Sequence, residues 1–289
     1  MQSLVLVPEP RELEILSGTC RIDTDLEKKL SVYTLDSKIP VGIECSIDEN
    51  LTKQEYYTLL IEPGGIDITA KTPRGLFYAV QTLRQIVRQA VKGSVPCMRI
   101  RDWPDYAVRS VMLDISRDRL PGMETIHMLI DLWSELKYNQ LQFYTEHTFA
   151  YSDHEFVWKE ASPLTAADIR HIAGYAAARG MELVPNQNSF GHMERWLKHP
   201  EYVHLPEAPY GFIDPWGIPS SSTTTLSPAV PESLVFLEKL YDEILPNFDS
   251  ILFNVGGDET FELGKGKSKT ICAEQGLSRV YIDFIKKNT

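Results

Sequence analysis

Short apolar runs alternate with amphipathic stretches from residue 108 onward, and this alternation restricts the fold more than any other feature of the sequence. Apolar runs of strand length occupy 108–115, 141–145, 181–185 and 251–255. Stretches with helical periodicity follow them at 123–137, 165–180, 228–245 and 267–287. Thr165 and Ser227 are suited to cap two of these helices, and Gly180 to end one. Four successive strand–helix units with apolar strands predict a parallel sheet buried on both faces.

Polar residues gather where these strands end. They are Asp114, Glu146, Asn186, Asn188, Asp258 and Glu259. An open doubly wound sheet and a (β/α)8 barrel both fit the alternation, and both bind ligands at the carboxyl ends of their strands. The position of the polar residues therefore predicts a site but does not choose between the two architectures.

Residues 1–104 have a different pattern. Alternating apolar residues on both sides of Pro63-Gly64-Gly65 predict a β-hairpin, and helical periodicity begins at Pro73. This predicts a small α+β domain, with a boundary near Asp102-Trp103-Pro104 because proline ends the preceding strand. We expect two domains, 1–104 and 105–289.

The net charge of −11 makes nucleic acid and anionic membranes poor partners. The four cysteines, Cys20, Cys45, Cys97 and Cys272, lie too far apart for a metal or redox motif and are expected to be reduced. Residues 1–5 lack the features of a signal peptide, and no apolar run has the length of a membrane helix, so we expect a cytoplasmic protein.

Three stretches carry candidate chemistry. Phe253–Thr260 places two glycines and then Asp258 and Glu259 after an apolar strand, so the backbone can bend and present both carboxylates. Val184–His192 ends in a histidine at the same predicted edge, and Val108–Arg117 puts Arg109 in a buried strand. Each has a plain alternative: an exposed acidic loop, a structural histidine, and an internal ion pair of the arginine within the sheet.

Together these stretches resemble glycoside hydrolase family 20. The matching positions are Arg109, Leu113, Asp114, Ser116 and Arg117; Pro185 through His192; Gly256 through Glu259; and, in the first domain, Thr72–Tyr78 and Gln81–Gln85. Their order and spacing agree with the family over essentially the whole chain. The resemblance implies a small α+β domain followed by the first four βα units of an incomplete (β/α)8 TIM barrel.

The resemblance also implies a β-N-acetylhexosaminidase that uses substrate-assisted, retaining hydrolysis without a cofactor or metal. Glu259 is then the general acid and base, and Asp258 orients the 2-acetamido group of the substrate through its N–H. Arg109 binds ring hydroxyls, and His192 belongs to a hydrogen-bond network behind Glu259. The partner is a glycan or glycoconjugate that carries N-acetylhexosamine.

Two departures from the family pattern concern the same edge. A gapless comparison puts His147 opposite the family's histidine-orienting Asp, with Glu146 one place earlier, and we expect Glu146 to take that role. Asn186 and Asn188 replace acids of the family pattern, and Asn188 is retained with Glu146 and His147 as a substrate-binding candidate. Because the later barrel strands do not follow, the half-barrel edges are expected to be open and to favour self-association.

Two other interpretations remain. A metal-dependent hydrolase could use Glu146, His147, His192 and Asp258 as ligands, and a carbohydrate-binding protein could keep the fold without catalysis. Gly264-Lys265-Gly266-Lys267-Ser268 is similar to a phosphate-binding loop, but Phe261 stands where that motif requires glycine. We interpret this last segment as a solvated loop.

Overall fold

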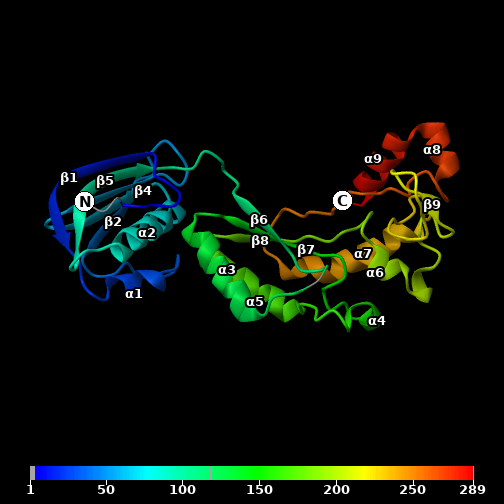
Figure 1. Ribbon diagram of the computed structural model, residues 1–289, viewed down its shortest axis with the longest axis horizontal. Coiled ribbons are helices and arrows are strands. Elements are labelled where there is room, and N and C mark those ends of the chain that lie inside the picture. The colour runs from blue at the N-terminus through cyan, green and yellow to red at the C-terminus, as the bar shows by residue number, and fades with distance from the viewer. Residues whose placement is uncertain (1–3, 118, 289) are drawn as a thin grey trace. The chain divides into compact units, whose positions relative to one another are not determined.

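A computed structural model of the chain describes residues 4–117 and 119–288. The chain divides into two compact units (Figure 1). The first contains the chain up to Val111 together with Met123–Gln140 and Gly174–Glu182; the second contains Met112–Gly122, Leu141–Ala173 and the chain from Leu183 on. This division differs from a single cut after residue 104, because the helix α3 (Met123–Glu135) contributes to the first unit, where Glu135 pairs with Arg84. The part of the N-terminal prediction that rests on Met1, Gln2 and Ser3 lies outside the described residues.

A five-stranded sheet forms the centre of the first unit. Its order is β1-β5-β3-β4-β2, with bounds β1 (Glu12–Arg21), β2 (Ile43–Ile47), β3 (Tyr57–Glu62), β4 (Gly65–Ala70) and β5 (Ser94–Asp102). All neighbours are antiparallel except β2 and β4, which run parallel. Tyr57 pairs with Ala70 and Glu62 with Gly65, which confirms the predicted hairpin.

The helix α2 (Pro73–Arg88) covers the sheet of the first unit, and a short helix α1 (Leu26–Ser31) lies beside it (Figure 1). Thr72 caps α2, because its hydroxyl accepts a hydrogen bond from Gly75 N at 3.1 Å. Ala79, Val80 and Leu83 are fully buried in the core with the inward side chains of β3 and β4. This confirms the predicted α+β arrangement.

Three strands, β6 (Ser110–Asp114), β7 (Gln140–Tyr144) and β8 (Glu182–Val184), form a sheet in the order β6-β7-β8. Backbone hydrogen bonds join residue 139 to 109 and residue 115 to 144, so the pairing advances in the same sense along both chains and the strands are parallel. The same holds for β7 and β8, through residues 139 and 182 and then 145 and 188.

The predicted strand at 251–255 is reduced to one parallel bridge between Asn186 and Asn254. The prediction of a full strand is therefore wrong for this structure. Asn254 N donates to Pro185 O at 3.0 Å, but Ile251 is 97% exposed and no described segment forms a ladder with the rest of the run.

The predicted helices of the second half are present, with changed ends. In α5 (Ala166–Ala177), Thr165 and Asp168 cap each other reciprocally, and Gly180 follows at φ 72°, as predicted. The helix α7 (Glu232–Ile244) begins later than expected: Ser227 Oγ accepts a hydrogen bond from Ala229 N at 3.3 Å and donates one to Glu207, and 228–231 form a turn before the helix. Gly276 divides the last predicted helix into α8 (Lys269–Gln275) and α9 (Leu277–Lys287).

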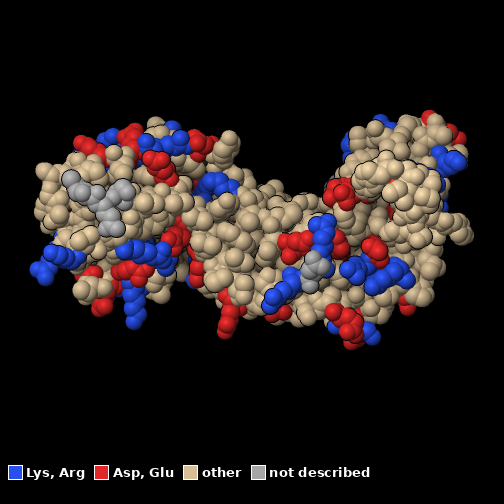
Figure 2. Space-filling view, in the orientation of Figure 1, with Lys and Arg blue, Asp and Glu red and all other residues tan. Residues whose placement is uncertain are grey.

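Short elements complete the second unit. They are α4 (Glu155–Trp158), α6 (Glu194–Leu197), β9 (Phe212–Ile213) and β10 (Pro219–Ser220). The four cysteines are free thiols. Within residues 4–117 and 119–288, no helix combines the length and apolarity of a membrane span. Acidic and basic side chains are interspersed on the face drawn in Figure 2.

Candidate acid–base site

The ends of the parallel strands in the second unit are joined by side chains. Ser116, after β6, accepts a hydrogen bond from Glu146 N at 2.8 Å, and Asn186, after β8, accepts one from Thr145 N at 2.8 Å. Ser189 donates to Val255 O at 2.7 Å. Short polar side chains after each strand thus fix the loops that carry the candidate acids and histidine.

Two glycines bend the chain before Asp258. Gly256 has φ 69° and Gly257 φ 107°, which side chains rarely tolerate. At Gly256 a Cβ atom would lie 2.4 Å from Asn188 Oδ1. Tyr281 of α9 donates to Gly257 O at 2.9 Å and holds the bend. The predicted role of the glycine pair is confirmed.

The bend presents both carboxylates to solvent. The side chains of Asp258 and Glu259 are 61% and 59% exposed. Glu259 adopts φ 52°, an unfavourable conformation for a residue with a side chain. Such strain is typical of sites in which the surrounding structure fixes a reactive group.

His192 lies between the acidic side chains. Its Nε2 is 3.1 Å from Asp258 Oδ2 and 3.5 Å from Glu259 Oε2, and its Nδ1 is 3.9 Å from Glu146 Oε1. His192 also has a left-handed backbone, with φ 55°. The absence of a side chain at Gly191 lets its backbone approach the backbone of Asp258, because a Cβ at this position would lie 2.1 Å from Asp258 O. The two candidate loops therefore meet backbone to backbone.

Glu146 is held by Tyr144, which the sequence analysis did not select, and by Arg117. Tyr144, the last residue of β7, donates its hydroxyl to Glu146 Oε1 at 3.0 Å. Arg117 stacks 4.6 Å from the centre of the Tyr144 ring and pairs with Asp114. Burial raises the pKa of Glu146, against the lowering effects of Tyr144, His192 and Arg117. The signal for Tyr144 was its place as a polar aromatic residue at the carboxyl end of a strand.

Glu262 connects the loop that follows Glu259 with the loop that follows His192. Its side chain is fully buried, and Oε1 accepts a hydrogen bond from Thr224 N at 2.7 Å. Thr224 O in turn accepts one from Met193 N at 2.9 Å, directly after His192. The segment after Glu259 is thereby tied to the segment after His192. Burial raises the pKa of Glu262.

Two predicted residues have other surroundings in the second unit. His147 is buried, its Nδ1 has no hydrogen-bond partner among the described residues, and burial beside Arg195 and Lys198 lowers its pKa to about 4. Asn188 has no exposed surface and donates to Thr145 O at 3.1 Å. Their placement differs from that of ligand-contacting residues: Asn188 supports the glycine bend.

Arg109 belongs to the first unit and is not part of this cluster. Its guanidinium donates to Glu55 Oε2 at 2.7 Å, to the Tyr78 hydroxyl at 3.0 Å and to Lys137 O at 2.7 Å. The structure thus shows an internal ion pair at Arg109, although its partner is a glutamate of the N-terminal region. The role of Arg109 in binding hydroxyls stays a prediction.

The segment Gly264–Ser268 encloses an internal anion. Glu207 is fully buried and accepts hydrogen bonds from Gly266 N at 3.1 Å, Ser268 N at 2.9 Å and Ser268 Oγ at 2.7 Å. A Cβ at Gly266 would lie 1.9 Å from Glu207 O. The loop is therefore a carboxylate nest and only partly the solvated loop expected from the sequence.

The residues proposed as metal ligands are Glu146, His147, His192 and Asp258. Across residues 4–117 and 119–288, no group of three or more His, Cys, Asp or Glu side chains has the geometry to hold a metal ion. Glu146, His192 and Asp258 lie near one another, whereas His147 lies beside two cations.

Paired acids beside a histidine, at the carboxyl ends of parallel strands, define an α/β protein of the kind that supports acid–base chemistry. Two family models then match the chain: glycosyl hydrolase family 20, domain 2, over residues 25–103, and the glycosyl hydrolase family 20 catalytic domain over residues 106–280. The chain belongs to glycoside hydrolase family 20.

Curated relatives agree with this family. The chain is 27% identical over 248 residues to a β-hexosaminidase subunit A2 of Dictyostelium discoideum, covering 82% of this chain and 42% of that protein. It is 24% identical over 276 residues to a β-hexosaminidase of Akkermansia muciniphila, covering 88% and 51%. The chain thus spans about half the length of these relatives.

Solved structures share the fold. A chitobiase of Flavobacterium johnsoniae has a TM-score of 0.78 and 21% identity, with 98% of this chain and 50% of that chain covered. An exo β-N-acetylglucosaminidase of Vibrio harveyi, in complex with N-acetylglucosamine, also has a TM-score of 0.78, with 20% identity, and the match covers 98% and 53%.

Proposed function

We propose that this chain forms the N-terminal part of a β-N-acetylhexosaminidase, which removes terminal β-linked N-acetylhexosamine from glycans. The observation that carries the proposal is the position of His192 between Asp258 and Glu259, with Glu146 on its other nitrogen. Family membership and the β-hexosaminidase names of the relatives support it.

The proposed reaction is substrate-assisted and retains configuration. The acetamido oxygen of the substrate attacks the anomeric carbon, and the aglycone leaves with the proton of Glu259. Glu259 then takes a proton from water, whose oxygen bonds to the anomeric carbon and opens the oxazolinium ring. The solvent-exposed Glu259 side chain suits both transfers.

Asp258 accepts a hydrogen bond from the acetamido N–H in this proposal, and its negative charge stabilises the positive ring. His192 positions Asp258 through the 3.1 Å contact, and Glu146 fixes the histidine from its other side. Tyr144 and Arg117 hold Glu146 in turn.

We further propose that β6, β7 and β8 are the first three strands of a (β/α)8 barrel, and that the 251–255 segment, with its single parallel bridge at Asn254, occupies the position of the fourth. The parallel order of the strands and the match to about half of each solved chain support this. Exposed apolar residues on and near the strands, among them Met112 and Ile251, support self-association of this chain. Sedimentation of the purified chain tests this, and a monomer at all concentrations would contradict it.

Hydrolysis of a chromogenic N-acetyl-β-glucosaminide tests the function, with this chain and with a longer protein that contains it. Glu259→Gln is expected to lower kcat by about 10²–10⁴-fold, because the general acid is lost. Glu274→Gln, an exposed acid on α8, is the matched control and should leave the rate unchanged. A Glu259→Gln variant as active as its parent would sink the assignment.

The mechanism has its own test. A thiazoline analogue of the oxazolinium intermediate should inhibit competitively, and Asp258→Asn should weaken that inhibition as well as the rate. Activity without inhibition by the thiazoline would favour an enzyme nucleophile and contradict the substrate-assisted route.

A further inference from the structure

A cavity of about 810 Å³ lies in the first unit, and none of the acids of the candidate site lines it. Residues 7–11, the end of β5 with the following loop, and 136–138 form its walls, and Glu55, Tyr57, Tyr78 and Arg109 complete it. Pockets for small ligands commonly measure roughly 300–1,000 Å³. The volume is therefore sufficient for one or two pyranose rings.

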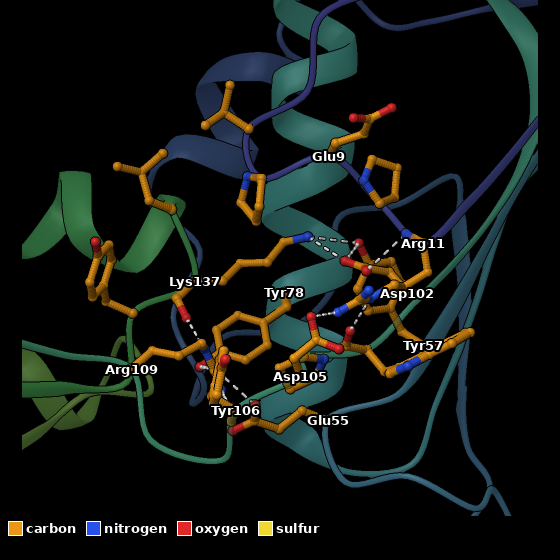
Figure 3. Close-up of a pocket in the computed structure, with 17 residues that line it drawn as sticks. Glu9, Arg11, Glu55, Tyr57, Tyr78, Asp102, Asp105, Tyr106, Arg109 and Lys137 are labelled. Carbon is orange, nitrogen blue, oxygen red and sulfur yellow. Dashed lines mark hydrogen bonds and ion pairs between the residues drawn. The ribbon is translucent and has the colours of Figure 1, made fainter.

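Three ion pairs join six of the seven charged side chains that line the cavity, and the seventh, Glu9, is exposed to solvent. Lys137 Nζ lies 2.7 Å from Asp102 Oδ2, Arg109 Nη2 lies 2.7 Å from Glu55 Oε2, and Arg11 pairs with Asp105. Figure 3 shows Lys137 reaching across the cavity toward Asp102. A charged ligand would have to compete with one of these existing partners, whereas a neutral ligand would not.

Hydrogen-bonding capacity remains around the pairs. Lys137 Nζ donates to Asp102 and, at 3.0 Å, to the Tyr57 hydroxyl, which leaves one of the three ammonium protons without a partner among the described residues. The Tyr78 hydroxyl accepts from Arg109 at 3.0 Å, and burial raises its pKa to about 12, so it keeps its own proton for donation. The carboxylates supply further acceptor positions.

Aromatic side chains add apolar surface to the same walls. Trp103, Tyr106 and Tyr138 line the cavity, and Tyr106 is 75% exposed. A pyranose ring has one C–H face that packs on an aromatic ring and an edge of hydroxyls that exchange hydrogen bonds with ammonium, carboxylate and phenol groups. Large, rigid aromatic rings beside a few fixed polar groups are the usual composition of ligand pockets.

We propose that this cavity is a second carbohydrate-binding site, which takes a neutral saccharide of one or two rings. The choice of β-linked N-acetylhexosamine as that saccharide rests on the function proposed above; the neutrality of the ligand rests on the three ion pairs alone. The site holds glycan in the small unit and performs no chemistry on it.

The experiment is an NMR titration of the Glu259→Gln chain with N,N′-diacetylchitobiose, and with the doubly de-acetylated, cationic disaccharide of the same skeleton. The indole N–H signal of Trp103, assigned with Trp103→Phe, reports on the cavity. We expect this signal to shift with the neutral sugar and to show binding at least about tenfold weaker for the cationic one.

Variants separate the cavity from other sites. Tyr106→Ala should weaken the Trp103 response about tenfold and Tyr78→Phe less, because the latter loses only a hydroxyl. Tyr210→Ala, a fully exposed tyrosine of the second unit, is the matched control and should change nothing. Circular dichroism checks that each variant is folded.

No shift of Trp103 with the neutral sugar would overturn the proposal, and so would equal binding of the cationic sugar. An unchanged response in Tyr106→Ala would also overturn it. Asp258→Asn distinguishes the two hypotheses, because it abolishes activity if the proposed function holds and leaves the cavity response intact. Cavity binding without any hydrolysis in the parent chain or the longer protein would refute the proposed function alone.

Discussion

The two units place their charged side chains in opposite ways. In the first unit, Lys137 and Asp102 are buried against each other, and the half-buried Arg109 pairs with the buried Glu55. In the second, Asp258 and Glu259 are about 60% exposed and rest on a bend that glycines make possible. The first arrangement uses charge to fix the fold, and the second keeps charge free for a ligand.

Each of the two arrangements is unfavourable in its own way: the first removes charges from water, and the second strains the backbone. A buried ion pair must compensate for the water that both charges lose, so its partners depend on each other. An exposed acid on a strained backbone depends little on its own side chain and strongly on the segments that hold it. We therefore expect stability to respond to side-chain changes in the first unit and to backbone changes in the second.

The largest effect should come from Lys137→Met, which leaves Asp102 buried and unpaired. We expect a loss of about 3–5 kcal/mol in the free energy of unfolding, measured by urea denaturation. The double variant Lys137→Met with Asp102→Leu should recover most of it. Glu259→Gln should change stability by less than about 0.5 kcal/mol, since its side chain is exposed. Equal losses of unfolding free energy in Lys137→Met and Glu259→Gln would contradict the proposed difference between the two units.

Gly191→Ala should be among the most harmful small changes in the second unit. A Cβ there would lie 2.1 Å from Asp258 O, so the two loops must separate, at a cost of about 2–3 kcal/mol. Gly174→Ala in α5 meets nothing within 4 Å and should stabilise the chain by about 0.5–1 kcal/mol. Thermal unfolding measures both, and a harmless Gly191→Ala would show that the loops are not in contact.

Glu262→Ala tests the connection between the two loops. Removal of the acceptor leaves the partly buried Thr224 N unpaired, which should cost about 1–3 kcal/mol. Hydrogen exchange at Met193 N should accelerate, because Thr224 O is its acceptor. Glu262→Gln keeps an acceptor oxygen at the same place, so Met193 N should exchange slowly in this variant. Fast exchange of Met193 N in both variants would show that the negative charge of Glu262, and not its acceptor oxygen, holds the loops.

His147 is a buried titratable group of the second unit that lies beside two cations, Arg195 and Lys198. Its pKa falls from 6.5 to about 4, so the unfolded chain binds the proton more readily. Stability is then full above pH 6.5 and declines as pH falls toward 4, on the order of 1–2 kcal/mol after solvent screening. In His147→Gln this decline should be smaller, as followed by denaturation between pH 4 and 7; an identical decline would place the titration elsewhere.

Local signals allowed much of this to be predicted from the sequence. The hairpin at Pro63, the start of helical periodicity at Pro73 and the cap at Thr165 depend on neighbouring residues, and each was predicted correctly. The glycine bend before Asp258 was also found, because its signal lies within one short segment. Such features need no knowledge of distant contacts.

The missed features depend on residues far apart in the chain. Ser227 caps no helix; its hydroxyl accepts from Ala229 N in a turn and donates to Glu207, 20 positions away. The partner of Arg109, Glu55, lies 54 positions away, and Glu262 acts on a residue 38 positions away. The strand expected at 251–255 depends on neighbours along its whole length, and it has only one bridge. Periodicity and capping rules carry no information on such pairs.

The nest around Glu207 determines whether the Gly264–Ser268 loop can bind phosphate. A glycine- and lysine-rich loop that would otherwise attract phosphate already encloses a carboxylate of the same polypeptide. The donors of the loop are therefore already bound to Glu207, and none of these donors is left to bind inorganic phosphate or a nucleotide. The position of α8, which begins directly after Ser268, becomes independent of the phosphate content of the medium.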